Sequence, residues 1–592
     1  MDDKDKSITD QWLEMGNTFT QLMRQNQAMM SSFLKQPSPG AVDPLNTGPA
    51  FKKALTGLVA DPQQLMQSNY DLWSQHMDLW QELTLDIFDK QGTAEAKGST
   101  GYDRRFKHED WSQNPAFDYI KRSYTITSKW FVETMRSIEG LDDADRDKVE
   151  FYSQLMVDAF APSNFALTNP EVLRTMVETG GQSLVNGLKN LQRDMDPKTG
   201  QLSITMTDPD AFTVGEDIAT TPGKVVFQND LAQLIQYTPT TKRVFKRPLV
   251  IVPPWINKFY ILDLQPKNSF IAWAVEQGYT VFVVSWVNPD TALANKTFED
   301  YMQEGILDML DAVEAASGHD EVNMIGYCIG GTLLSATLAY MADQGDERVK
   351  SATFFASQAD FSEAGALKIF TDEAQIDNLE AMMGEKGYLE GSAMSTTFNM
   401  LRANDLIWSF YVDNYLLGKE PLKFDLLHWN ADATRMPRET HLFYLRQMYL
   451  HNNLAKPGGI TLKGVPIDLS KVTIPIYWQS SREDHIAPYK SVFKSTGLYS
   501  GPVRFMLAGS GHIAGVINPP SSKKYGYWIN EDQPKDLEAW LEGAEAFEGS
   551  WWPDWHKWLK SKSGTRVKAR IPGDRDLPAI EDAPGSYVLV KS

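Results

Sequence analysis

The sequence predicts an α/β protein whose main sheet is largely parallel and whose first part is helical. Before residue 200 the apolar residues recur mainly at helical spacing, whereas the rest of the chain alternates short apolar runs with helical stretches. That alternation is typical of a parallel sheet covered by helices. The apolar runs are 249–252, 281–284, 322–325, 352–355, 474–478 and 503–507.

The chain is too long for a single core. A protein of 592 residues and 66.8 kDa is expected to fold as two or more domains. Helical patterns continue through 117–191, and strands are predicted at 203–207 and 224–227. We therefore place a boundary near residue 200, between a helical N-terminal domain at 1–200 and a catalytic domain at 201–592.

Two amphipathic patterns mark the N-terminal domain. Apolar residues over 12–33 fall at helical spacing and precede a proline-rich linker over 37–49. A second helix is predicted to start at Asp61 and Pro62, an N-cap and first-turn pair. Its apolar residues at heptad spacing are Met66, Trp73, Trp80 and Ile87, with Tyr70 and Met77 beside them. This face packs either on the chain's own catalytic domain or against a dimer partner, an accessory protein or an apolar surface, and both alternatives stay open.

A long aromatic insertion is predicted between the fourth and fifth apolar runs, at about 365–435. Its aromatic residues include Phe398, Trp408, Phe410, Tyr411, Tyr415, Phe424 and Trp429. An insertion at this place in an α/β domain is where a lid over the active site is expected. The same side chains would also form a small core of the insertion itself, and the two interpretations are compatible.

The segment Gly326-Tyr327-Cys328-Ile329-Gly330-Gly331 predicts a nucleophile elbow. Cys328, the single cysteine of the chain, occupies the serine position of a G-x-S-x-G motif, between a strand-like run and a small-residue helix. The flanking glycines let strand and helix approach closely. The helix N-terminus favours a thiolate, and the N–H of Ile329 would supply half of an oxyanion hole. The alternative is an inert core cysteine, which the glycine spacing and the strand-helix context disfavour.

The partners of Cys328 are expected at the carboxyl ends of later strands. Asp484 follows the run 474–478, and His512 follows the run 503–507. The order nucleophile, acid, histidine makes the α/β-hydrolase fold the predicted fold class. His512 would take the proton from the sulfur, while Asp484 would orient the imidazole or polarise a second hydroxyl. His485 is expected to have a structural or orienting part.

A second oxyanion donor is expected after the first apolar run. That run, 249–252, is followed by 253–258, the place from which an α/β-hydrolase draws its second oxyanion N–H. The donor is predicted to be Trp255 or Ile256, and the sequence does not decide between them.

The composition excludes several classes of function. A formal net charge of −20 and a pI near 5.0 argue against nucleic acid as the main partner. No Cys/His cluster has zinc-site spacing, and neither a P-loop nor a dinucleotide loop is present, so no metal and no cofactor is expected. The first residues form no signal peptide, and no apolar run approaches the ~18 residues that span a bilayer. We expect a cytoplasmic protein without a transmembrane segment.

Several segments together resemble the polyhydroxyalkanoate synthases. They are 253–263, 326–331, 426–430, 484–487 and 511–515, joined in the helical part by 103–106 and 161–165. The resemblance covers most of the chain and matches least over the first hundred residues. A single long chain with its own N-terminal domain is similar to the class I enzymes, which favour short-chain 3-hydroxyacyl-CoA and need no second synthase subunit.

This resemblance implies polymerisation of (R)-3-hydroxyacyl-CoA into polyester with release of CoA, through a triad of Cys328, His512 and Asp484 and an acyl-cysteine intermediate. The CoA thioester is then a substrate, and no cofactor is needed. A homodimer at the surface of a polyester granule in the cytoplasm is expected, with granule-associated accessory proteins as further partners. The alternatives are a thiol esterase or depolymerase with the same triad, and a non-enzymatic granule scaffold, which the intact triad set disfavours.

Overall fold

The computed structural model describes residues 47–88, 103–197 and 202–591, and the chain divides into two compact units. The first unit consists of Met1–Asp208 and Phe398–Leu422, and the second of Pro209–Thr397 and Lys423–Ser592. The amphipathic pattern over 12–33 and the linker up to residue 46 lie outside the described residues.

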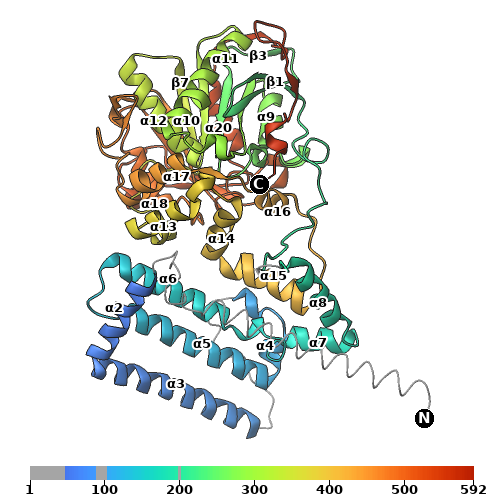
Figure 1. Cartoon of the computed structure of the whole chain (residues 1–592), viewed down its shortest axis with the longest axis vertical. Coiled ribbons are helices and arrows are strands. Elements are labelled where there is room, and N and C mark those ends of the chain that lie inside the picture. Colours follow the sequence, from blue (N-terminus) through green and yellow to red (C-terminus); the bar gives the residue numbers. More distant parts are fainter. Residues whose placement is uncertain (1–46, 89–102, 198–201, 592) are drawn as a thin grey trace, which may run out of the picture. The chain divides into compact units, whose positions relative to one another are not determined.

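The first unit is built of helices whose starts are encoded locally (Figure 1). Its α-helices before residue 200 are α2 Thr47–Ala60, α3 Pro62–Phe88, α4 Asp110–Gln113, α5 Pro115–Arg136, α6 Asp143–Ala159, α7 Pro170–Glu178 and α8 Gln182–Asp194. Asp61 accepts a hydrogen bond from the N–H of Gln64 at 2.9 Å, which confirms the predicted start of α3. Asn114 and Asn169 cap α5 and α7 in the same way, each followed by proline in the first turn.

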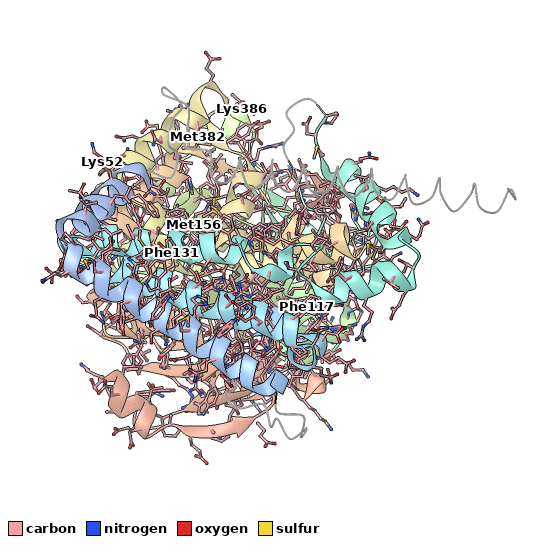
Figure 2. All side chains as sticks on the ribbon, turned by 90° about the horizontal axis from the view of Figure 1, so that it is seen from below. Lys52, Phe117, Phe131, Met156, Met382 and Lys386 are labelled. Atoms are coloured by element: carbon pink, nitrogen blue, oxygen red, sulfur yellow. The ribbon has the colours of Figure 1, made fainter. Side chains whose placement is uncertain are left out.

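One hydrophobic cluster of this unit joins α2, α5 and α6. Ala50 and Ala54 of α2 are buried together with Met135, and Phe131 packs against this cluster from α5. Figure 2 labels one residue on each of the three helices, namely Lys52 on α2, Phe131 on α5 and Met156 on α6. The small alanines let α2 approach its neighbours closely, so the helices share one core.

A second cluster joins this unit to part of the aromatic insertion. The π-helical turns η9 Asn404–Trp408 and η10 Val412–Leu416, with α15 Ser409–Tyr411 between them, bury Trp408, Tyr411 and Tyr415 among residues of α6, α7 and α8. The hydroxyl of Tyr415 donates to Asp194 Oδ2 at 2.6 Å, and Asn190 donates to the carbonyl of Asn414 at 3.0 Å. These aromatic residues of the insertion therefore belong to a core shared with the helices.

The prediction of a strand at 203–207 is wrong. These described residues form no strand, and the neighbouring Leu202 makes only an isolated bridge to Met195. Asp194 instead accepts from both the N–H and the hydroxyl of Thr205, at 3.0 and 2.7 Å. The buried carboxylate of Asp194 thus accepts the backbone hydrogen bond of Thr205 that a neighbouring strand would otherwise have accepted.

The second unit contains, in the described part of the chain, an 11-stranded sheet in the order β15-β14-β13-β12-β7-β6-β4-β5-β2-β1-β17. Its strands are β1 Gly223–Gln228, β2 Ala232–Tyr237, β4 Leu249–Val252, β5 Val281–Trp286, β6 Val322–Tyr327, β7 Val349–Phe355, β12 Ile476–Ser481, β13 Val503–Ala508, β14 Gly526–Ile529, β15 Glu545–Glu548 and β17 Glu581–Asp582. The pairs from β5 through β4, β6, β7 and β12 to β13 are parallel, and the outer pairs are antiparallel. All the predicted apolar runs are therefore strands of the parallel part, and the predicted strand at 224–227 lies in β1.

The second unit also contains helices, several of which flank this sheet (Figure 1). They are α9 Phe270–Glu276, α10 Phe298–Met302, α11 Asp308–Ser317, α12 Ile329–Gln344, α13 Glu373–Met383, α16 Asp425–Ala431, α17 Arg438–Tyr444, α18 Tyr489–Thr496, α19 Leu537–Glu542 and α20 Trp552–Lys560, while α14 Gly391–Leu401 crosses the boundary between the units. Aromatic rings fill the core, as where Phe270 meets Trp552 edge to face at 5.1 Å. Trp555, also buried, donates to the hydroxyl of Thr353 in β7 at 3.0 Å, which fixes α20 against the sheet.

Helix α3 carries a row of exposed apolar side chains, which we call the α3 stripe: Met66, Tyr70, Trp73, Met77 and Trp80. The exposed fraction of Trp73 is 59% and that of Met66 is 72%. The heptad spacing predicted from the sequence therefore forms one face of this helix, although the side chain of Ile87 lies outside the described residues. Contiguous exposed apolar side chains of this size mark an interaction surface. Within the described ranges, no helix is long and apolar enough to cross a bilayer.

Candidate active site

Cys328 lies at the turn between β6 and α12, as the motif predicts. Its backbone has φ 52° and ψ −126°, outside the regions that side-chain-bearing residues ordinarily adopt. The N–H of Cys328 donates to the carbonyl of Phe355 at 2.9 Å, and the hydroxyl of Ser357 donates to the carbonyl of Cys328 at 2.8 Å. The surrounding chain thus holds a strained residue in place, as is common at catalytic positions.

The glycines of the elbow are needed because the first turn of α12 lies very close to the backbone of β4 and β6. A Cβ atom on Gly330 would lie 2.4 Å from the carbonyl oxygen of Val252, and one on Gly326 would lie 2.4 Å from the Cα of Gly331. Both contacts are with backbone, which cannot move aside. The elbow therefore brings the first turn of α12 directly against the end of β4.

Asp484 and His512 lie together at the ends of β12 and β13. The two strands pair in parallel, so their carboxyl ends meet at one edge of the sheet. His512 Nδ1 lies 2.7 Å from Asp484 Oδ2, and both side chains are buried. Asp484 Oδ1 accepts from the N–H groups of Ile486 and Ala487 at 2.8 and 2.9 Å. Both oxygens of the carboxylate are therefore in use, and Nε2 of His512 is left for a second partner.

The sulfur of Cys328 is close enough to the His512 ring to interact with it electrostatically. Burial alone would lower the pKa of His512, but the adjacent Asp484 carboxylate and the Cys328 sulfur raise the pKa well above its usual value. The structure thus brings together Cys328, His512 and Asp484. This arrangement can transfer a proton between sulfur and imidazole, and the carboxylate stabilises the imidazolium.

The predicted oxyanion donors belong to the two segments that meet at the elbow. Ile329 is the first residue of α12, so its N–H has no acceptor within the helix. Trp255 and Ile256 follow β4, whose end is in contact with Gly330 of the elbow. The carbonyls of Trp255 and Ile256 both accept hydrogen bonds from Thr434.

Two tyrosines near the thiol were not predicted. Tyr444 ends α17, and Tyr449 follows in the π-helical turn η11 Leu445–Leu450; both are buried and both interact electrostatically with Cys328. Burial raises the pKa of each hydroxyl, so both stay protonated and able to donate. In the sequence, the aromatic residues within 443–449 are the signal that could have pointed to these tyrosines. The same pattern is equally typical of side chains that pack in a hydrophobic core. His485 is half-buried next to Asp484.

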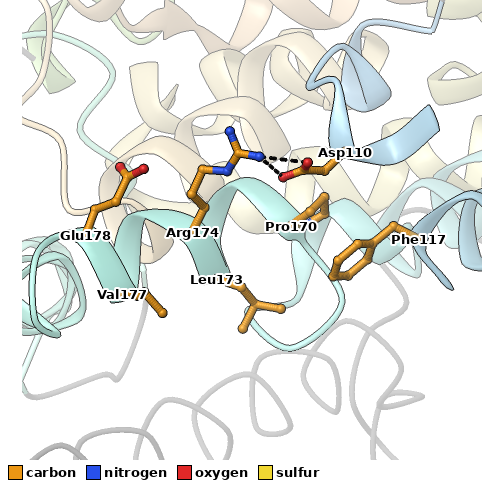
Figure 3. A pocket seen from close by; sticks show the side chains of 7 residues that line it. All are labelled: Asp110, Phe117, Pro170, Leu173, Arg174, Val177 and Glu178. Atoms are coloured by element: carbon orange, nitrogen blue, oxygen red, sulfur yellow. Dashed lines mark hydrogen bonds and ion pairs between the residues drawn. The ribbon is translucent and has the colours of Figure 1, made fainter. Parts of the chain in front are cut away.

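A separate hollow lies within the helical unit (Figure 3). It has a volume of about 480 Å³ and is lined by Asp110, Phe117, Pro170, Leu173, Arg174, Val177 and Glu178. Arg174 donates two hydrogen bonds to the carboxylate of Asp110, at 2.7 and 2.6 Å, so its charge is already paired. None of the predicted site residues lines it. Among the residues that the structure describes, no cluster of histidine, cysteine and carboxylate side chains is placed to hold a metal ion.

Comparison with known proteins agrees with this architecture. The family model described as Poly-beta-hydroxybutyrate polymerase (PhaC) N-terminus matches residues 102–274, and the model described as alpha/beta hydrolase fold matches residues 247–519. The second match and the parallel sheet with its elbow confirm the predicted α/β-hydrolase fold.

Relatives match over most of the chain. A poly(3-hydroxyalkanoate) polymerase of Methylorubrum extorquens is 51% identical over 533 residues, which cover 90% of this chain and 88% of the relative. A poly(3-hydroxyalkanoate) polymerase subunit PhaC of Rhizobium meliloti is 49% identical over 534 residues, covering 90% and 87%. The protein of the same description from Cupriavidus necator is 41% identical over 545 residues, covering 91% and 90%.

Proposed function

Because this chain belongs to the poly(3-hydroxyalkanoate) polymerase family, we propose that it polymerises (R)-3-hydroxyacyl-CoA into a polyester through an acyl-cysteine on Cys328. The observation that carries this proposal is the pairing of His512 with Asp484 at 2.7 Å beside the sulfur of Cys328, which interacts electrostatically with the His512 ring. A thiol nucleophile with its own base and a carboxylate behind that base is an acyl-transfer site.

The first half-reaction loads the enzyme. His512 accepts the proton of the Cys328 thiol, and the sulfur attacks the thioester carbonyl of the substrate. The tetrahedral intermediate collapses with cleavage of the bond from carbonyl carbon to CoA sulfur. His512 returns the proton to the departing sulfur, so free CoA and an acylated Cys328 are formed. One thioester replaces another, so this step is close to balanced in energy.

The second half-reaction extends the chain. A 3-hydroxyl group gives its proton to His512, and its oxygen attacks the acyl carbon on Cys328. The bond from carbon to Cys328 sulfur breaks, an ester bond forms, and the proton on His512 restores the thiol. An oxoester is more stable than a thioester, so this step drives polymer growth.

Asp484 acts in this scheme as the orienting group of His512. One of its carboxylate oxygens contacts Nδ1 of the ring, and the other is held by two backbone N–H groups. This environment supports a fixed anion that stabilises the imidazolium rather than a base that removes a hydroxyl proton itself.

The α3 stripe supports the proposal that the enzyme is located at the surface of its polyester product. The growing polyester is insoluble in water, and the row from Met66 to Trp80 offers apolar side chains for contact with such a surface. We therefore propose a polyester granule as the location of the enzyme, with α3 in contact with the granule.

Replacement of the nucleophile tests the mechanism. Cys328→Ala should release CoA from (R)-3-hydroxybutyryl-CoA at less than ~0.1% of the native rate, because the loss of one triad member removes most of the catalytic acceleration. In the native protein, a brief reaction followed by acid quench should leave a hydroxyacyl group on the peptide that contains Cys328. Normal CoA release by Cys328→Ala, with the acyl group on another residue, would refute the assignment.

A further inference from the structure

The loop that follows β4 is bound along its length by one segment of the chain. We call residues 253–258 the oxyanion loop and residues 429–435, which end the insertion, the return segment. Asn257 and Ala433 form an antiparallel bridge, and the indole N–H of Trp429 donates to the carbonyl of Lys258 at 2.7 Å. The N–H of Thr434 donates to the carbonyl of Ile256 at 3.1 Å. The return segment therefore fixes the backbone from which a second oxyanion donor is expected.

Charged and polar side chains also connect the two segments. Lys258 Nζ lies 2.7 Å from Asp432 Oδ1, and the hydroxyl of Tyr260 donates to Asp432 Oδ2 at 2.9 Å. The side chain of Lys258 is only 3% exposed and that of Asp432 only 12%. Burial of such an ion pair brings little net stability, so its specific effect is to fix the position of its partners. Here those partners are the end of the oxyanion loop and the middle of the return segment.

Thr434 determines the direction of one peptide unit in the loop. Its hydroxyl donates to the carbonyl of Trp255, and both residues are buried. The carbonyl of Trp255 and the N–H of Ile256 belong to the same planar trans peptide and point in opposite directions. With the carbonyl held by Thr434, the N–H of Ile256 must point away from the return segment.

We infer that the return segment positions the oxyanion hole, with Thr434 orienting the N–H of Ile256 and Asp432 anchoring the loop through Lys258 and Tyr260. Ile256, rather than Trp255, is then the second donor beside Ile329. The inference rests on the proposed function, because an oxyanion forms only if Cys328 attacks a thioester. Thr434 and Asp432 are positioning residues, since they act through the loop and not on the substrate.

The test compares two variants of Thr434. Thr434→Val keeps the size of the side chain but removes the hydroxyl, whereas Thr434→Ser keeps the hydroxyl. Loss of an oxyanion donor costs roughly 10²–10³ in kcat, and a donor left in the wrong direction should cost at least ~10-fold. We expect Thr434→Val to lower kcat for CoA release by that factor with KM little changed, and Thr434→Ser to remain within ~3-fold of the native enzyme.

A second measurement separates positioning from general damage. Alkylation of Cys328 by iodoacetamide needs the thiolate but forms no oxyanion, so its rate should be the same in Thr434→Val as in the native protein. Thr434→Ala serves where valine prevents folding, and Asp432→Asn should show the same pattern as Thr434→Val. Equal kcat for the valine and serine variants, or an equal loss of alkylation and acylation, would overturn the inference. Absence of CoA release from the native protein would instead refute the proposed function.

Discussion

The chemistry of the site depends at the residue scale on His512. Its buried ring contacts the Asp484 carboxylate and interacts electrostatically with the Cys328 sulfur, and these two neighbours outweigh burial in raising its pKa well above the usual value. A histidine placed in this way holds a proton readily and returns it to a leaving group only when the sulfur is engaged with substrate.

Removal of the Asp484 charge should change how stability depends on pH. A histidine with a raised folded-state pKa contributes stability that is fully present below its unfolded pKa, near ~6.5, and is lost as pH rises through the folded pKa. In Asp484→Asn the burial of His512 would lower that pKa instead. The Tm of the native protein should therefore exceed that of Asp484→Asn most at pH 6, and the difference should shrink steadily toward alkaline pH. Differential scanning calorimetry over pH 6–10 measures this difference, and a gap independent of pH would contradict the role given to His512.

Single residues also show which parts of the site were predictable. Cys328, Asp484 and His512 lie a few residues after apolar runs, so their positions at strand ends were implied by local pattern, and the structure brings them together. Thr434 and Asp432 follow no motif. Their relation to the oxyanion loop arises from a bridge between segments far apart in the chain, for which a single sequence has no local signal.

At the scale of elements, α3 should bind an apolar surface through its stripe. Burial of even half of a tryptophan's ~200 Å² contributes on the order of 2–3 kcal/mol. Trp73→Gln combined with Met77→Gln should therefore lower association with polyester granules by more than ~10-fold and leave CoA release from soluble substrate unchanged. A sedimentation assay with isolated granules measures this association. Gln75→Ser, on an exposed position of the same helix, is the control.

An unchanged granule association in the double variant, with Gln75→Ser also unchanged, would remove α3 from the granule contact. Equal losses in the double variant and in Gln75→Ser would show that the helix, and not its apolar stripe, matters. Only a loss confined to the stripe agrees with the proposal.

Prediction of elements succeeded where periodicity was strong. The strands of the parallel sheet and the elbow helix α12 have apolar or small-residue patterns that allow one interpretation, and they form as expected. The stretch 203–207 has a strand-like alternation, but the carboxylate of Asp194 accepts the N–H of Thr205 and these residues form no strand. Part of the insertion, over 398–422, belongs to the compact unit of the helices, because its tyrosines and tryptophan find their apolar partners there.

At the scale of the whole molecule, one chain combines the proposed acyl-transfer site with an apolar helical surface. The α/β-hydrolase unit holds Cys328, and the helical unit carries the α3 stripe. A hydrolase needs only the first of these features, because its product leaves in water. An enzyme that makes an insoluble polyester benefits from both, since it must remain close to a growing apolar product.

The measurement that tests this account most directly is the fate of (R)-3-hydroxybutyryl-CoA mixed with the purified native protein. Free CoA thiol, turbidity and soluble 3-hydroxybutyrate are followed in the same reaction. Polymerisation predicts CoA release matched by hydroxybutyryl units in an insoluble polyester, with little free acid. CoA release matched instead by soluble 3-hydroxybutyrate, with no polymer, would show a thioesterase and contradict the account.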